Sequence, residues 1–173
     1  PHFRVENEKI VRRHMFATAL ASFWRKNPTY FGKVVDFLYQ EESGASKFEQ
    51  FLRSRPKDLY RSLKHIVPPA LCNSLGVEDW EWTKELCQKD SGLLDFASED
   101  IMQDISKLEV VKDELYKKGK RVDFLSRLIK TLKEKNLIEF MSNSNIIPKY
   151  GFPVDVVQLQ TFHHGEEAKR LKL

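Results

Sequence analysis

The most regular apolar pattern in this chain is Ser98-Glu-Asp-Ile-Met-Gln-Asp-Ile-Ser-Lys-Leu-Glu-Val-Val-Lys-Asp-Glu-Leu-Tyr116. Its inward-facing residues recur mostly every three or four positions, at Ile101, Ile105, Leu108, Val111 and Leu115. Residues at this spacing share one face of an α-helix, which predicts an amphipathic helix of about five turns. The run Lys117-Lys-Gly119 follows, and glycine favours the left-handed backbone conformation that ends many helices. We therefore expect the helix to end at this glycine.

The residues that follow predict a second helix from about Arg121 to Lys135, with four apolar residues facing inward: Leu125, Leu128, Ile129 and Leu132. Beyond it, the apolar positions between Leu137 and Met141 predict a short helix. A β-hairpin closing at residues 142–145 is the alternative, because short apolar runs discriminate poorly between strand and helix. In that case residues 121–152 would form a winged-helix-like unit.

The N-terminal third predicts one long helix followed by short ones. Asn7 is a good N-cap for a helix that Asn27-Pro28 would end. Its apolar stripe consists of Val11, Phe16, Ala19, Leu20, Phe23 and Trp24.

Shorter helical units are predicted between residues 34 and 86. Val34 to Leu38 form an apolar cluster, and Ser46-Lys-Phe-Glu49 fits a capping box that would open a helix. Pro56 is suited to the first position of the next helix, which would point Leu59, Leu63 and Ile66 inward. A further short helix should start within residues 79–82, and its Trp80 and Trp82 could not both face one side.

The expected fold is therefore mainly α, with six to eight helices in a domain of residues 1–143. Residues 144–173 would form a connector and tail, with a short extended segment near residues 144–160. Pro148 and Pro153 each remove a backbone donor and favour extended geometry before them, while Gly151 permits unusual angles. These residues are typical of a specified connector.

Composition indicates a folded chain with an ordinary core. Apolar residues make up 41% and aromatic residues 12%, more than disordered segments contain. The net charge of +4 permits contact with nucleic acid but does not require it. No apolar run approaches the ~20 residues that span a bilayer, and no signal peptide is visible. We expect a cytoplasmic protein with two reduced cysteines, Cys72 and Cys87.

No catalytic constellation is recognisable, so we expect no enzyme activity from this chain alone. Paired carboxylates such as Glu99-Asp100 are neighbours on a helix, where their side chains diverge. His14, His65 and the pair His163-His164 are spread too widely to predict a metal site, and no cofactor is expected.

Basic residues give the candidate binding sites. Lys9, Arg12 and Arg13 lie on one predicted helix and could contact phosphate, brace a neighbouring domain, or simply be solvated. A second basic zone surrounds the predicted junction of two helices, where the cations could follow a DNA strand or favour a helix C-terminus. Its members are Lys117, Lys118, Lys120, Arg121, Lys130, Lys133 and Lys135.

The connector adds Lys149 and Tyr150, which could clamp a phosphate or a base. Tyr150 and Phe152 could instead anchor the connector on the helices. The candidate nucleic-acid contacts are accordingly Lys9, Arg12, Arg13, Lys118, Lys120, Arg121, Lys149 and Tyr150.

Two motifs near the ends of the chain are similar to those of one family. They are Asn7-Glu-Lys-Ile-Val-Arg-Arg-His14 and Asn145-Ile-Ile-Pro-Lys-Tyr-Gly-Phe-Pro-Val-Asp-Val-Val157, and Asp123-Phe-Leu-Ser-Arg-Leu128 through Glu139-Phe-Met141 adds to them. The chain resembles the region between the second RecA-like motor domain and the zinc-binding domain of large bacterial superfamily 2 DEAD/DEAH-type helicases (the MrfA-like group). The resemblance is weak between about residues 26 and 120.

The resemblance implies a non-catalytic accessory domain that couples motor and zinc domain and guides DNA, in repair or phage defence. A motor needs a G-x-x-x-x-G-K phosphate loop, which this sequence lacks. ATP, Mg²⁺ and Zn²⁺ would therefore belong to other domains of the parent enzyme, and we expect this chain to be a fragment of it. The alternative is a helical protein-interaction scaffold without nucleic-acid contact.

Overall fold

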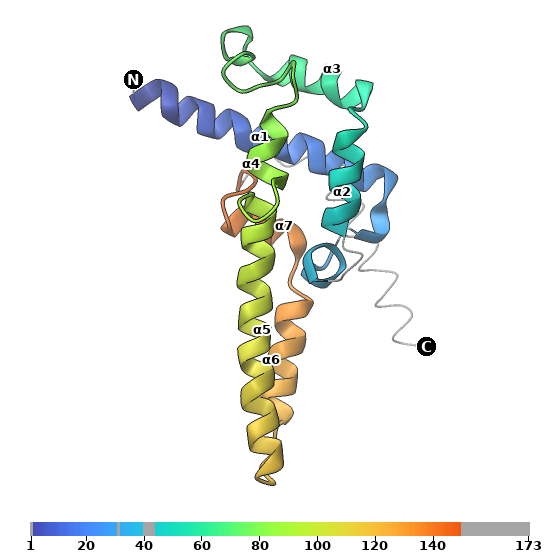
Figure 1. Ribbon diagram of the computed structural model, residues 1–173, viewed down its shortest axis with the longest axis vertical. Coiled ribbons are helices and arrows are strands. Elements are labelled where there is room, and N and C mark those ends of the chain that lie inside the picture. The colour runs from blue at the N-terminus through green and yellow to red at the C-terminus, as the bar shows by residue number, and fades with distance from the viewer. Residues whose placement is uncertain (1, 31, 40–43, 150–173) are drawn as a thin grey trace.

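The computed structural model describes residues 2–30, 32–39 and 44–149, and this part of the chain is mainly helical, as predicted (Figure 1). Its elements follow in the order α1 (His2–Lys26), the 3₁₀ helix η1 (Pro28–Tyr30), the π-helix η2 (Val35–Tyr39), α2 (Gly44–Arg53), α3 (Lys57–Ile66), the 3₁₀ helix η3 (Pro69–Leu71), α4 (Trp82–Cys87), α5 (Leu93–Lys117), α6 (Asp123–Lys133) and α7 (Leu137–Asn143).

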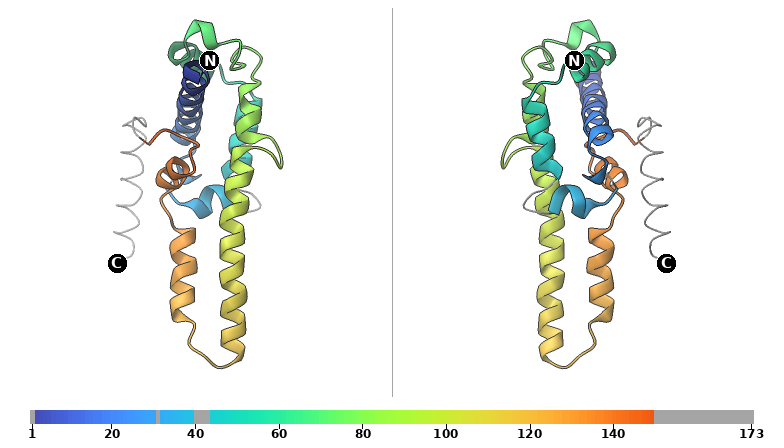
Figure 2. Two further views of the ribbon diagram at one scale, coloured as in Figure 1. Left: turned by 90° about the vertical axis from the view of Figure 1, so that its left-hand side faces the viewer. Right: turned by 90° about the vertical axis from the view of Figure 1, so that its right-hand side faces the viewer.

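These elements form a head and a projecting helical hairpin. The head contains α1 to α4, with α3 packed across α1 (Figure 1). The long α5 leaves the head and packs against α6, and the two antiparallel helices project beyond the head (Figures 1 and 2). The turn that joins α5 to α6 is therefore the end of the molecule farthest from the head.

The C-terminal half of α1 is the centre of the head. Its side chains from Met15 to Trp24 are almost all buried around the whole circumference, whereas Lys9 and Ile10 in the other half are exposed. A helix that is apolar on all sides is expected to lie inside a core. The helix begins at His2, so Asn7 is not its N-cap. Residues 2–6 contain no proline or glycine that would stop the helix before Asn7.

An aromatic cluster joins α1 to α2 and η2. The ring of Phe23 lies 5.5 Å from Phe48 and 6.4 Å from Phe37, and Trp24 lies 5.6 Å from Phe37. These edge-to-face or tilted arrangements are the favourable ones for aromatic pairs. All four rings are at least 98% buried. The cluster therefore holds α1, α2 and η2 together in the part of the head next to the hairpin.

Backbone and side-chain hydrogen bonds fasten the hairpin to the head. Antiparallel bonds join residues 32–34 to residues 135–137: Val34 N–H to the Lys135 carbonyl, and Leu137 N–H to the Gly32 carbonyl, both at 2.9 Å. On the other side, the Ser98 hydroxyl donates to the Leu38 carbonyl at 2.8 Å. Both helices of the hairpin are therefore held where they leave the head.

The alternative of a β-hairpin after residue 135 is wrong. Leu137–Asn143 form α7, whose N-cap Asn136 accepts from the Glu139 N–H at 3.0 Å. The helix ends with Asn145 at a φ of 59°, and the Ile146 N–H bonds the Met141 carbonyl. Asparagine tolerates this conformation, so residues 142–145 cap a helix rather than close a hairpin.

Three local predictions in the head also need correction. The helix α2 begins at Gly44, so Ser46 lies inside it and is not its cap. Ile66, in the last position of α3, is 41% exposed, whereas Val67 directly after it is buried. Trp80 and Trp82 are both buried, with ring centroids 5.7 Å apart. Trp80 precedes α4 and has a φ of 60°, which turns its side chain toward the same side.

The predicted connector can be followed only at its start. Residues 144–149 form turns and bends rather than an extended segment, and Ile146 and Ile147 are buried in the helical core. The remainder of the predicted extended segment, including Tyr150 and Phe152, lies outside the described residues. The predicted boundary between residues 143 and 144 stays a prediction.

Candidate nucleic-acid interface

The turn between α5 and α6 is a compact helix cap, as the sequence predicts for Gly119. This glycine has a φ of +74°, its N–H bonds the Tyr116 carbonyl at 2.9 Å, and the Lys120 N–H bonds the Leu115 carbonyl at 3.0 Å. The pair of bonds is the Schellman pattern of a helix C-terminus. The chain reverses direction within these few residues, and the side chains of Lys117, Lys118, Lys120 and Arg121 are exposed to solvent.

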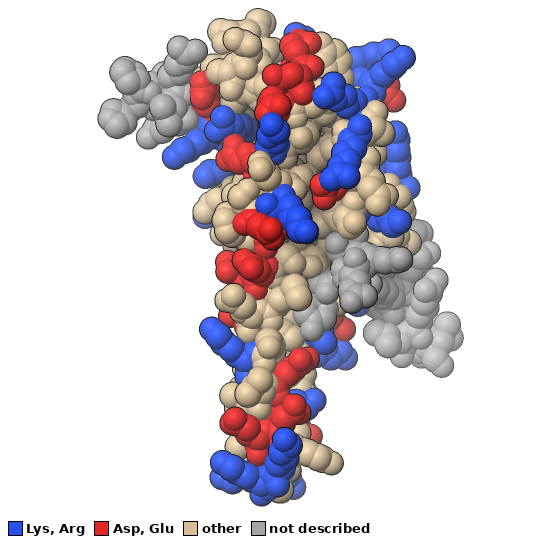
Figure 3. Space-filling model, viewed as in Figure 1, with Lys and Arg blue, Asp and Glu red and all other residues tan. Residues whose placement is uncertain are grey.

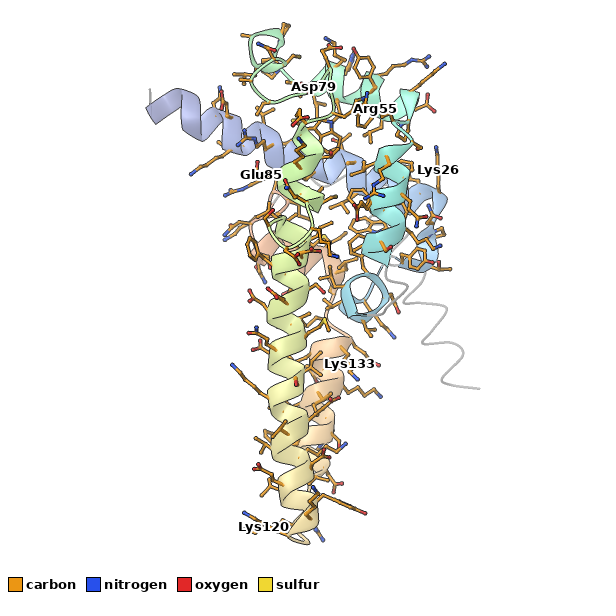
Figure 4. The ribbon with its side chains drawn as sticks, viewed as in Figure 1. Lys26, Arg55, Asp79, Glu85, Lys120 and Lys133 are labelled. Carbon is orange, nitrogen blue, oxygen red and sulfur yellow. The ribbon has the colours of Figure 1, made fainter. Side chains whose placement is uncertain are left out.

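Four of the five residues in this turn are cations. Lys117, Lys118, Lys120 and Arg121 are all exposed, and no acid lies between them in sequence. Figure 3 shows blue side chains gathered at the far end of the hairpin, and Figure 4 places Lys120 there. We call these four residues, with Tyr116 and Phe124 beside them, the hairpin tip.

The shaft of the hairpin has a different charge pattern. Between Ser98 and Tyr116, α5 carries two lysines, Lys107 and Lys112, against six exposed acids: Glu99, Asp100, Asp104, Glu109, Asp113 and Glu114. Figure 3 shows red side chains along α5 above the basic end. A polyanion approaching from the α5 side would be repelled along this shaft and attracted at the end. On the α5 side the attraction is therefore concentrated at the hairpin tip, whereas α6 adds the exposed cations Arg127 and Lys130.

Sequence reasoning missed the two aromatic residues of this site. Tyr116 in the last turn of α5 is 72% exposed, and Phe124 in the first turn of α6 is 69% exposed. Each is next to a half-buried leucine of the hairpin contact, Leu115 or Leu125, so the helical period turns it off the inward face. Their position beside a basic turn and off the apolar stripe was the signal that could have found them.

The other lysines of the predicted basic zone are less suited to contact with DNA at the hairpin tip. The Nζ of Lys133 lies 4.0 Å from a carboxylate oxygen of Glu109, which ties α6 to α5. Figure 4 shows Lys133 on the part of α6 nearer the head, well away from Lys120. Lys130 and Lys135 are exposed but lie outside the turn. The structure thus brings Lys117, Lys118, Lys120 and Arg121 together, apart from Lys130, Lys133 and Lys135.

The predicted cluster on α1 is far from the hairpin tip. Arg12 pairs with Glu85 of α4, with Nε 3.2 Å from Oε2, while Arg13 is half-buried and Lys9 is exposed. Lys9, Arg12 and Arg13 therefore belong to the head, and one of them already has a carboxylate partner within the chain. Lys149 is exposed beyond α7, and Tyr150 lies outside the described residues.

A cavity of about 490 Å³ lies between α2 and α4 in the head. Arg53 and Lys84 line it, but each is paired, with Glu49 and Glu81 respectively, at 2.7 Å. Cys87 also lines it, and burial raises the pKa of its thiol to about 12, which makes it a poor nucleophile. Two of the cations in the cavity wall therefore already have carboxylate partners.

A second polar cluster fastens α3 to the loop before α4. Glu78 accepts hydrogen bonds from Lys64 and from the Tyr60 hydroxyl. The bond from Lys64, with that from Tyr60, lowers the pKa of Glu78, while the bond to this carboxylate raises the pKa of Tyr60 and of Lys64. The three side chains are hydrogen-bonded to one another, so we interpret the cluster as a structural link between α3 and the loop before α4.

Within the described ranges, no group of three or more His, Cys, Asp or Glu residues gathers as metal ligands would. In the same part of the chain, no helix is long and apolar enough to cross a membrane. Comparison with protein-family models, with curated proteins and with solved structures finds no match.

Proposed function

We propose that this chain is a non-catalytic accessory domain of an ATP-dependent DNA helicase or translocase. It would couple the motor to a zinc-binding domain and guide DNA, in the cytoplasm, during repair or phage defence. The sequence motifs at residues 7–14 and 145–157 support the class of enzyme. The observation that carries the DNA contact is the group of four exposed cations at the end of a projecting hairpin.

The geometry of the hairpin supports a guiding role over a purely structural one. Each cation that meets a phosphate releases condensed counterions, which is the main source of sequence-independent affinity for nucleic acid. The exposed acids of α5 disfavour DNA lying along that side of the hairpin, so contact from there would be made end-on. A projecting basic end can therefore meet DNA while the head remains bound to another domain.

The head would make the contact with the parent enzyme. The N-terminal half of α1 projects from the head and exposes Ile10 to 52%. Arg12 braces α1 against α4 through Glu85, while Lys9 and Arg13 remain candidates for contact with DNA or with the motor domain. In such an enzyme ATP, Mg²⁺ and Zn²⁺ would be bound by the motor and zinc domains, and this chain would position them relative to DNA.

The test is fluorescence anisotropy with labelled single-stranded, duplex and forked DNA at several salt concentrations. If all four cations contact phosphates of a single strand, the logarithm of the binding constant should fall with the logarithm of salt concentration at a slope of about −3. The variant Lys118→Ala/Lys120→Ala, which removes two positive charges, should abolish most binding. Arg12→Ala/Arg13→Ala serves as the matched change in the head and should weaken binding much less. Absence of binding to every DNA at low salt would refute the proposal.

A scaffold without nucleic-acid contact is the second candidate, favoured by exposed apolar side chains on α5. Phe96 is 49% exposed, Met102 46% and Val110 55%, and Val111, predicted to face inward, is 43% exposed. These side chains lie among the α5 acids, which suits a protein partner better than DNA. An anisotropy that does not change with salt concentration for any of the three DNA forms would support this candidate.

A further inference from the structure

We propose that the hairpin tip selects unpaired over duplex DNA, because Tyr116 and Phe124 stack on exposed bases while the neighbouring cations hold the phosphates. This inference rests on the proposed contact with DNA and specifies the form of DNA that the contact takes. It is independent of which enzyme the chain belongs to.

The exposure of the two rings is the first step. Phe16, Phe23, Phe37 and Phe48 are each at least 98% buried in the head. Tyr116 and Phe124 are instead 72% and 69% exposed, more than the other large apolar side chains described as exposed. Aromatic rings usually contribute to a core or to an interface, and neither ring here is in the core. Both are placed to meet something outside the hairpin.

The charges around the rings select the partner. Lys117, Lys118, Lys120 and Arg121 lie between the two aromatic residues in sequence and within one turn in space. Rings interleaved with cations are the combination found where proteins hold single strands, since bases stack on the rings and phosphates meet the cations. A purely apolar protein partner would have to bury these four charges without compensation, which is unfavourable.

Stacking on the two exposed rings favours an unpaired strand, because only an unpaired strand presents free base faces. In a duplex the faces of the bases are covered by their neighbours, so a ring can reach them only after they unstack. A single strand offers every base face, and stacking on an aromatic side chain is tolerant of sequence. The backbone bonds around Gly119 hold the turn in place, so the rings and cations are arranged before the strand arrives.

The experiment compares labelled oligo(dT) with a blunt duplex of equal length, using the whole chain. In Tyr116→Ala/Phe124→Ala all charges are kept, and we expect affinity for oligo(dT) to fall at least about tenfold while the weaker duplex binding is unchanged. Phe96→Ala removes an exposed ring at the other end of α5 and should leave both affinities as they are. Far-UV circular dichroism of each variant checks that the helices are retained.

A direct readout comes from Tyr116→Trp. Because the native Trp24, Trp80 and Trp82 are buried in the head, a change in fluorescence on adding DNA would be assigned to the new indole. Its fluorescence should be quenched by oligo(dT) and not by the duplex. Equal affinity for both DNA forms, or an unchanged affinity in the double alanine variant, would overturn the inference and leave the proposed DNA contact standing. Loss of all binding in wild type would defeat both, and binding to anionic lipid vesicles alone would do the same.

Discussion

Arg12 of α1 and Glu85 of α4 form an ion pair, with the arginine Nε 3.2 Å from a carboxylate oxygen. The pair spans two elements of the head that are far apart in sequence, and its side chains keep 33% and 47% of their exposure. Solvent at this level screens the attraction, so we expect a coupling of only about 0.5 kcal/mol between Arg12→Ala and Glu85→Ala in a double-mutant cycle. Urea unfolding of the four proteins measures it.

The exposed Lys9→Ala is the control for this cycle and should show no coupling to Glu85→Ala. A coupling near zero for the Arg12 pair would mean that the contact is not maintained in solution. Arg12 would then be as free as Lys9 to meet DNA or a neighbouring domain.

Replacing Gly44 by alanine should destabilise the protein, although alanine is the better helix former. A Cβ at this position would lie 2.7 Å from Cδ2 of Phe37 and 2.8 Å from Cβ of Tyr30. Phe37 and Tyr30 would have to move to make room for the methyl group, and overpacking of this kind costs about 1–3 kcal/mol. The solvent-exposed Lys47→Ala on the same helix should change stability by less than about 0.5 kcal/mol. A stabilised Gly44→Ala protein would contradict the packing described here.

Gly119→Ala and Gly76→Ala should differ in a defined order. Both glycines have positive φ, +74° and +70°, so alanine is strained at each by about 1–2 kcal/mol. A Cβ on Gly119 meets no atom within 4 Å, whereas one on Gly76 would lie 2.8 Å from Cβ of Glu81. Thermal unfolding should therefore show the larger loss for Gly76→Ala. Equal losses would mean that the loop before α4 adjusts freely.

The thiol of Cys87 should be almost inert in the native protein. Burial raises its pKa to about 12 from the ordinary thiol value of 9.0, so at pH 8 its reaction with a disulfide reagent should be about a thousandfold slower than in the unfolded chain. A Cys72→Ser background isolates this thiol, and the same protein in guanidinium gives the reference rate. Because only the unfolded state ionises readily, this thiol should lower stability as pH rises above about 9. Fast native labelling at pH 8 would show that the site opens.

Much of the helical pattern could be predicted because it is set by local periodicity. The helices containing Ile105, Ile129 and Met141 follow from apolar spacing, and Gly119 ends the first of them as expected. The spacing does not predict how completely neighbouring elements cover the apolar face of each helix. Leu108, Leu115 and Leu125 look like core residues in the sequence but are only half-buried, since one partner helix covers them in the hairpin.

Other features depended on contacts between distant residues. The burial of both Trp80 and Trp82 requires a positive φ at Trp80, for which an aromatic side chain gives no local signal. The exposure of Tyr116 and Phe124 was readable from their offset to the leucines, but their importance depends on the hairpin projecting from the head. That projection is set by the bonds at residues 32–34 and at Ser98, which no short window of sequence contains.

The fixed point at Ser98 makes α5 a lever arm. From Ser98 to Lys117 the helix rises about 28 Å at 1.5 Å per residue. A tilt of about 10° at that point would carry the hairpin tip through about 5 Å, more than the ~3.4 Å between successive nucleotides of a duplex strand. A small rocking of the head would thus be magnified into a displacement of several ångströms at the hairpin tip.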